Sequence, residues 1–149
     1  MNKLTLSALS FAIVLGMAGC QPETPAETQQ DVAEARVDAN EEVRDAQLDA
    51  NQTALDNNAD ISDEMATGDA SDVSDARVDA TEDTAEARHD VAMAKADGEL
   101  SIAKERCDGV ADVDRDACNA AADAEYEAAK AAATADLDAA NANAEAMKR

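Results

Sequence analysis

The sequence predicts an all-α protein of long alanine-rich helices that ends in an antiparallel helical hairpin closed by a disulfide, with coiled-coil-like packing. Alanine, the residue with the highest helix propensity, supplies most of the hydrophobic fraction of 46%. Apolar residues recur at helical steps of three and four along most of the chain. The cysteine pair Cys107 and Cys118 stands between two long helical patterns.

The composition excludes several classes of protein. Asp and Glu number 34 against 12 Lys and Arg, which gives a formal net charge of −22. Binding to nucleic acid or to anionic lipid needs a basic surface, so neither is expected. Tyr126 is the only aromatic residue after residue 20, and bulky aliphatic residues are few, so a large globular core is not expected either. The composition favours a self-repelling rod that attracts cations.

Residues 1–19 are interpreted as a targeting segment. Lys3 gives it a positive start, the apolar run 4–16 is short for a membrane span, and small residues precede Cys20. The segment resembles the bacterial lipoprotein signal, although an ordinary secretory signal cleaved near the same residues is the alternative. The resemblance implies that Cys20 carries the lipid, and acyl chains would hold the protein on a membrane. By the same resemblance, Gln21 in place of Asp implies the outer membrane, with the protein facing the periplasm.

Residues 20–30 are predicted to form a tether that turns into a helix start, followed by an acidic helix over 31–56. Thr24 is the expected cap, Pro25 the first helical residue and Glu27 the capping-box partner. The Asn57-Asn58 pair supplies the expected end. The apolar stripe of this helix repeats every eleven residues, which favours straight or slightly right-handed packing; its members are Val32, Ala35, Ala39, Val43, Ala46, Ala50 and Ala54. A second, narrow strip on nearly the opposite side comprises Val37, Leu48 and Leu55.

Residues 57–71 are predicted to be a flexible linker, because Gly68 stands there among Asp, Asn and Ser. Ser71 or Ser74 is then the expected cap of a second helix, which opens the hairpin over 72–149. This helix carries two opposed apolar stripes, so it should lie between two partners. The third helix would be one partner, and the first helix or another copy of the protein would be the other.

Cys107 and Cys118 are expected to form a disulfide, because an isolated pair in an exported protein is most simply a cross-link. For this loop length the chain-entropy model gives about 3 kcal/mol of stabilisation. The pairing predicts a turn centred near Asp112, with the second helix continuing one turn past Cys107 and the third running from about Asp114 to Met147. In that hairpin Ala96 faces Ala129.

The same hairpin geometry places His89 opposite Asp136, each on the cysteine-facing stripe of its own helix. This predicted pair joins the only histidine of the chain to a carboxylate of the third helix.

Two further resemblances concern the envelope. The segment 104–108 and the second cysteine at 118, followed by an alanine run, resemble a family of uncharacterised alanine-rich proteobacterial envelope proteins with a two-cysteine helical hairpin. That resemblance implies the disulfide hairpin and the cell envelope, and no activity. Lys148 near the C-terminus is similar to the attachment lysine of murein lipoproteins, but Arg149 follows it, so attachment to peptidoglycan is not expected.

No catalytic residue, cofactor or metal site is predicted, and the protein is not expected to be an enzyme. Residues 112–116 resemble the first half of an EF-hand loop, but Ala117 stands where glycine is required and Asp123 where a glutamate is usual. These aspartates are expected to cap the third helix instead. His89 has no nucleophile at an interpretable spacing.

Two functions stay open. The first is a membrane-anchored structural or interaction lipoprotein of the bacterial cell envelope, whose acidic helices project into the periplasm and associate with another copy or with an envelope protein. The second is an acidic envelope protein that weakly binds divalent cations. Only the second requires Mg²⁺ or Ca²⁺ to act beyond their ionic strength.

Overall fold

The structure, a computed structural model, describes residues 23–148 and consists there of three helices. These are α1 (Pro25–Thr67), α2 (Ala70–Asp108) and α3 (Asp112–Met147). The all-α class and the disulfide-closed hairpin of α2 and α3 are confirmed. Within the described part, no helix combines the length and hydropathy needed to cross a membrane.

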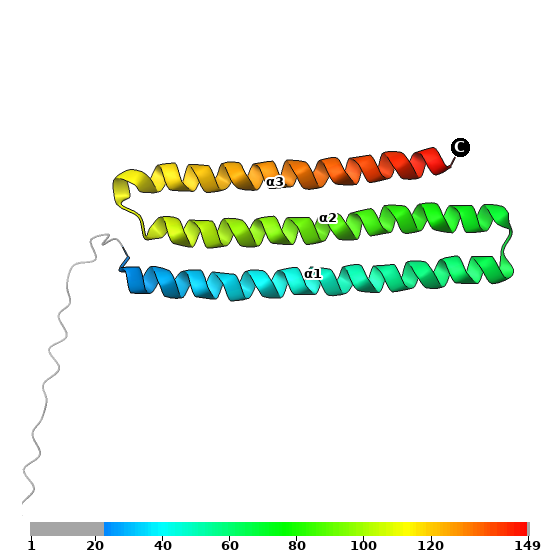
Figure 1. The fold of residues 1–149 in the computed structure, drawn as a ribbon, viewed down its shortest axis with the longest axis horizontal. Coiled ribbons are helices and arrows are strands. Elements are labelled where there is room, and N and C mark those ends of the chain that lie inside the picture. Colours follow the sequence, from blue (N-terminus) through cyan, green and yellow to red (C-terminus); the bar gives the residue numbers. More distant parts are fainter. Residues whose placement is uncertain (1–22, 149) are drawn as a thin grey trace, which may run out of the picture.

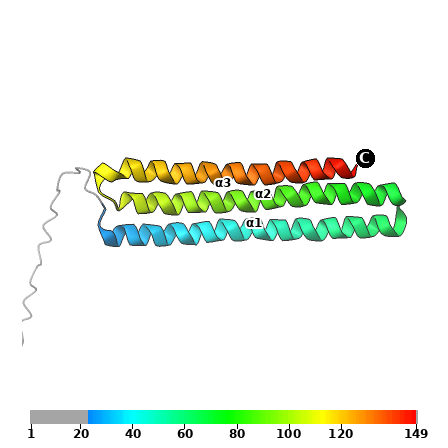
Figure 2. The same ribbon diagram turned by 45° about the horizontal axis from the view of Figure 1, so that its top comes forward.

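The three helices lie side by side in a flat layer with α2 in the middle (Figure 1). The same order, with α2 between α1 and α3, is seen when the molecule is turned by 45° (Figure 2). α1 packs on α2 and α2 packs on α3, whereas the described residues of α1 and α3 do not contact each other. The two partners expected for α2 are therefore α1 and α3, one on each side.

The start of α1 follows the predicted capping box. The Thr24 hydroxyl oxygen accepts a hydrogen bond from the Glu27 backbone N–H at 3.4 Å, and the Glu27 carboxylate accepts one from the Thr24 N–H at 2.9 Å. Pro25 occupies the first helical position, where no N–H is needed. The helix thus begins at Pro25, as the predicted capping box requires, and the boundary drawn between a tether over 20–30 and a helix over 31–56 falls inside α1.

The predicted linker over 57–71 is also wrong, because α1 continues through Asn57 to Thr67. Asn57 is buried, and its side-chain amide donates to the Ala80 carbonyl at 3.3 Å and to the Thr84 hydroxyl at 3.4 Å, both on α2. A residue that favours helix ends in isolation is therefore held inside a helix by hydrogen bonds to its neighbour. α1 stops at Gly68, whose N–H donates to the Glu64 carbonyl.

Only Gly68 and Asp69 connect α1 to α2. The Asp69 carboxylate accepts hydrogen bonds from the backbone N–H groups of Ser71 at 2.7 Å and Asp72 at 3.2 Å, so Asp69 is the cap. The predicted caps, Ser71 and Ser74, lie inside α2 instead. The Asp72 carboxylate completes a capping box by accepting from the Asp69 N–H at 3.1 Å.

Buried alanines repeat every eleven residues on both sides of the α2–α3 interface. The eleven-residue series consists of Ala85, Ala96 and Cys107 on α2 and of Ala122, Ala133 and Ala144 on α3, and Val78 is buried on the same side of α2, two turns before Ala85. Because alanine has a short side chain, the helices can pack closely. The hydrophobic core is correspondingly thin, and the described residue with the largest fully buried side chain is Val78.

The predicted stripe of α1 faces α2 from Val32 to Ala50. Beyond that point Ala54 is exposed, and Thr53 and Asn57 take its place. α1 approaches α2 closely at Gly98, where an added Cβ would lie 2.5 Å from the Cβ of Ala39. The sequence reasoning did not identify Gly98 as a contact residue.

The turn of the hairpin lies earlier than predicted. α2 ends at Asp108, one residue after Cys107, and α3 begins at Asp112, so the loop consists of residues 109–111. Gly109 ends the helix and lies against α1, since an added Cβ would be 2.7 Å from the Cγ2 of Thr28. The expected extra helical turn past Cys107 is therefore wrong.

Candidate functional site

Cys20, the predicted lipidation site, lies outside the described residues, as do the signal segment 1–19 and Arg149. The described chain begins at Glu23, and α1 begins at Pro25, five residues after Cys20. Any group attached to Cys20 is thus separated from a long helix by a very short connection. The N-terminal end of α1 lies at the same end of the layer as the α2–α3 turn (Figure 1).

The α2–α3 turn is closed by the Cys107–Cys118 disulfide, with a Cα–Cα distance of 5.6 Å. The pairing is as predicted, and Cys107 is almost fully buried at 2% exposure. Arg115 crosses the same turn: its guanidinium donates to the Asp108 carbonyl at 3.2 Å and pairs with the Asp112 carboxylate at 3.1 Å. The disulfide and the Arg115 contacts together hold the end of α2 to the start of α3, and we call them the disulfide staple.

The aspartates after the turn do only part of what was predicted. The N-cap of α3 is Ala111, which makes no side-chain capping bond, so the predicted capping by aspartate is wrong. Asp112 and Asp114 lie in the first turn, where their charges meet the positive end of the helix dipole. Among the described residues, no group of three or more His, Cys, Asp or Glu side chains is arranged to hold a metal ion.

Carboxylates of α1 and α2 line a groove on one face of the layer, which we call the acidic groove. It consists of two adjoining hollows of about 500 and 480 Å³ that share Asn57, Asp60 and Asp83. The acidic residues lining the first are Asp49, Asp56, Asp60, Asp83, Glu86 and Asp90. Those lining the second are Asp60, Asp63, Glu64, Asp72, Asp75, Asp79 and Asp83. Like charges thus meet across the α1–α2 contact.

Glu105, two residues before Cys107, is another carboxylate that lies close to other acidic side chains. Partial burial, followed by the charges of Asp31, Asp108 and Glu23, raises the pKa of Glu105. All four groups involved are carboxylates: Asp31 belongs to α1, Glu105 and Asp108 belong to α2, and Glu23 lies in the segment before α1. This repulsion opposes the α1–α2 contact and is screened by salt.

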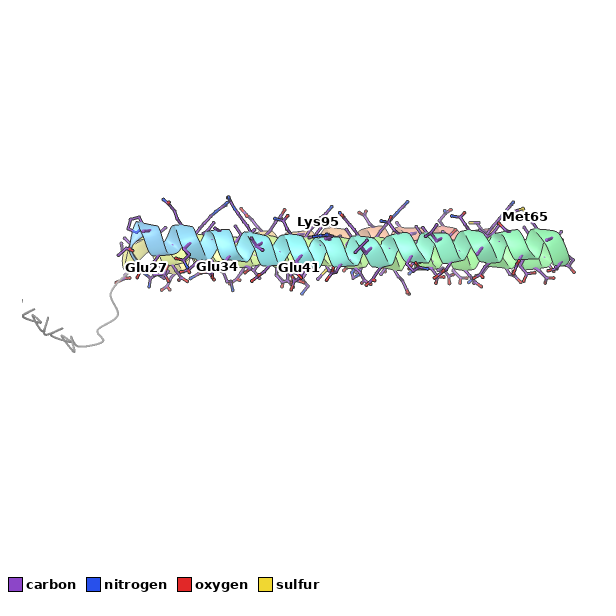
Figure 3. All side chains as sticks on the ribbon, turned by 90° about the horizontal axis from the view of Figure 1, so that it is seen from below. Glu27, Glu34, Glu41, Met65 and Lys95 are labelled. Atoms are coloured by element: carbon purple, nitrogen blue, oxygen red, sulfur yellow. A yellow bond between two sulfur atoms is a disulfide. The ribbon has the colours of Figure 1, made fainter. Side chains whose placement is uncertain are left out.

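The opposite face of α2 carries cations, which we call the cationic stripe: Arg77, Arg88, Lys95 and Arg106. Their steps of eleven, seven and eleven residues place them on one side of the helix. In the edge-on view, Lys95 lies on the other side of the layer from Glu27, Glu34 and Glu41 (Figure 3). The intramolecular ion pairs of the described chain use other cations: Lys104, Arg115, Lys130, Lys148 and His89. The sequence reasoning missed this stripe, although its eleven-residue spacing is visible.

A second groove, of about 800 Å³, lies on the face of the cationic stripe and takes residues from all three helices. Arg77 and Arg88 line it together with His89, Asp136 and Leu137. His89 and Asp136 therefore share one groove, as their predicted juxtaposition requires. They do not form an ion pair, however, because the His89 imidazole pairs with the adjacent Asp90 carboxylate at 3.5 Å.

Lys148 fastens the end of α3 to α2. Its ammonium donates to the Glu82 carboxylate at 2.9 Å and to the Glu145 carboxylate at 3.0 Å. These two hydrogen bonds raise the pKa of Lys148. The amine that the murein-lipoprotein resemblance would use for attachment thus pairs with two carboxylates of the chain.

Comparison with protein-family models, with curated proteins and with solved structures finds no match for this chain.

Proposed function

We propose that the protein is a lipid-anchored structural or interaction lipoprotein of the bacterial cell envelope, held at the outer membrane and projecting its acidic helices into the periplasm. The observation that carries the proposal is the closeness of the expected anchor to the fold: α1 begins at Pro25, only five residues after Cys20. A lipid on Cys20 would therefore fix the end of a long helical layer close to the membrane surface.

The shape supports the same proposal. A 43-residue helix such as α1 is about 65 Å long at 1.5 Å per residue. Its length, the absence of an evident active site among the described residues and the disulfide staple suit a spacer or a docking platform. The α2–α3 turn, closed by Cys107–Cys118, would lie at the membrane end, and the Gly68 turn would lie at the distal end (Figure 1).

The test is mass spectrometry of the mature N-terminus together with fractionation of the envelope. The expected result is a chain that begins at acylated Cys20 and sediments with outer membranes. The Cys20→Ser variant should remain uncleaved or appear in the soluble periplasmic fraction. A mature chain that begins elsewhere, or an unmodified Cys20, would contradict the proposal.

The acidic groove favours a second candidate, a weak accumulator of divalent cations. Carboxylates of two helices face each other there, so counterions would relieve their repulsion. No built coordination site is present in the described residues, which restricts this function to loosely held ions. Circular dichroism melts in NaCl and in MgCl₂ at matched ionic strength separate the two: a higher melting temperature in MgCl₂ supports cation binding, and equal melting temperatures exclude it.

A further inference from the structure

The outer edge of α1, opposite its contact with α2, carries a regular strip that is apolar at every position except Arg44. We call this the outer strip; its members are Ala26, Ala33, Val37, Arg44, Leu48, Leu55, Ala59 and Ala66. Their steps alternate between seven and four residues, so the strip repeats every eleven residues. That is the period of the stripe by which the same helix packs on α2, and it is the period of a helix–helix seam.

The outer strip is exposed over its whole length. Val37 is 65% exposed, Leu48 59% and Leu55 64%. By contrast, every large apolar side chain of α2 is at least half buried, because both apolar stripes of that helix are covered. A helix with two opposed apolar stripes is expected to pack against two partners. Within the chain α2 has two such partners, whereas α1 has only α2, which leaves its outer strip uncovered.

We propose that the second partner is the α1 helix of another copy of this chain, packed strip to strip and parallel, so that two three-helix layers join at their α1 edges. A two-fold axis along the helices would generate the pair. Such an isologous contact uses the same strip on both copies and closes on itself, so it produces a dimer and no filament.

Charge decides the direction of pairing. On one side of the strip α1 carries acids such as Glu34, Asp38 and Asp45; on the other it carries Arg36, Asn40 and Gln47. A parallel two-fold pair places the acidic side of one helix against the arginine and amide side of the other. An antiparallel pair places acid against acid on one face, which is unfavourable. The parallel pair also brings the Arg44 side chains of the two copies together at the seam, where acids beside the strip such as Glu41 and Asp45 would offset their repulsion.

Cysteine cross-linking in the full chain tests the pairing directly. In the parallel pair, residue 37 of one copy meets residue 37 of the other, so Val37→Cys should give a dimer cross-link after mild oxidation of cells. In an antiparallel pair centred on the strip, Val37 would instead meet Leu55, roughly 27 Å along the helix from Val37 of its own copy. Val113→Cys, at a side chain 86% exposed on α3, is the matched control and should remain monomeric.

Three results would overturn the proposal. One is a Val37→Cys chain that stays monomeric. Another is a cross-link that forms only when Val37→Cys and Leu55→Cys chains are mixed. The last is equal cross-linking by Val113→Cys. The wild-type chain, oxidised in the same way, is the control for any cross-link that forms through Cys20. The cross-link is measured in whichever cell fraction holds the protein, so a failure of lipid anchoring leaves this result readable.

Sedimentation of the purified full chain in mild detergent gives an independent measurement. Leu48→Asp places a carboxylate in the middle of the seam and should weaken dimerisation by more than about tenfold, with unchanged helical circular dichroism. Val113→Asp adds the same charge to another exposed apolar position and should leave the dimer intact. A wild-type protein that sediments as a monomer at high micromolar concentration, or equal effects of the two variants, would contradict the seam.

Discussion

The two interfaces of α2 hold their partner helices by different means. Towards α3, the contact is a ladder of buried alanines ending in the Cys107–Cys118 disulfide. Towards α1, there is no covalent link, and the backbones approach at Gly98 while Asn57 bridges to α2 by hydrogen bonds. The first interface is uniform and cross-linked, whereas the second depends on a few specific residues. Acidic side chains also crowd this second interface. The α1–α2 contact is therefore expected to be the more sensitive to single substitutions and to salt.

The largest expected effect comes from removing the disulfide. Cys107→Ala with Cys118→Ala should lower the free energy of unfolding by about 3 kcal/mol, because the unfolded chain regains the entropy of the open loop. Urea denaturation followed by circular dichroism measures the loss. The wild-type protein in reducing agent should match the variant. A loss near zero would mean that the alanine ladder alone sets the stability of this interface.

Next in size is Gly98→Ala, which tests the close approach of α1 and α2. An isolated helix would gain about 1 kcal/mol from this change. Here the new Cβ would overlap with Ala39, so a net loss of about 1–3 kcal/mol is expected. Adding Ala39→Gly should recover part of the loss by returning the space, and a double-mutant cycle from urea unfolding measures the coupling. Strictly additive effects of the two changes would show that these residues do not meet.

A smaller effect is expected for Asn57→Ala. The neighbouring Asn58→Ala is the matched control, because Asn58 is exposed and bonds only within its own helix, to the Ala54 carbonyl. Asn57→Ala should cost about 1 kcal/mol more than the control, since it removes hydrogen bonds to Ala80 and Thr84 across the interface. Equal unfolding free energies for the two variants would place Asn57 outside the interface in solution.

The smallest effect concerns the cap between α1 and α2. The hydrogen bond from the Ser71 side chain, followed by those from the backbone N–H groups of Ser71 and Asp72, lowers the pKa of Asp69. The charged cap therefore contributes stability above the unfolded Asp pKa of about 3.9, and this contribution is lost as pH falls through the lower folded value. Asp69→Asn caps without titrating.

The melting temperature of the wild type relative to Asp69→Asn should accordingly fall as the pH drops below about 4 and stay constant above that pH. Taking the difference between two chains removes the titration of the many other carboxylates, which both chains share. A pH-independent difference would show that Asp69 does not act as the cap.

The comparison of interfaces also explains which parts of the fold could be predicted. The helices, the disulfide and the capping box at Thr24 follow from local composition and spacing, and all three agree with the structure. The end of α1 could not be predicted, because Asn57 has a low helix propensity and is held in the helix by contacts with α2 that no local pattern encodes. Gly98 is similar: a lone glycine inside a helical pattern does not indicate which residue it meets.

The site predictions divide in the same way. The pairing of Cys107 with Cys118 depends on the contents of one short segment, so it could be derived. The formation of the expected His89–Asp136 pair depended on the side-chain rotamers of both residues as well as on the register of α2 against α3. The register brings both side chains to one groove, while the imidazole pairs with Asp90. The spacing of the charged residues already places the acids and the cations of α2 on opposite sides of that helix. Only the order of the three helices shows that these two sides become the two faces of the layer.

The open, single-layer arrangement has a mechanical consequence. Because α1 and α3 do not touch, the protein is a flat beam and its bending stiffness depends on direction. For cylinders about 10 Å across placed 8–10 Å apart, bending within the plane of the layer is roughly ten times stiffer than bending across it. The molecule should thus resist sideways deflection at its edges and flex towards its acidic or its cationic face, with a preferred plane of motion set by α2.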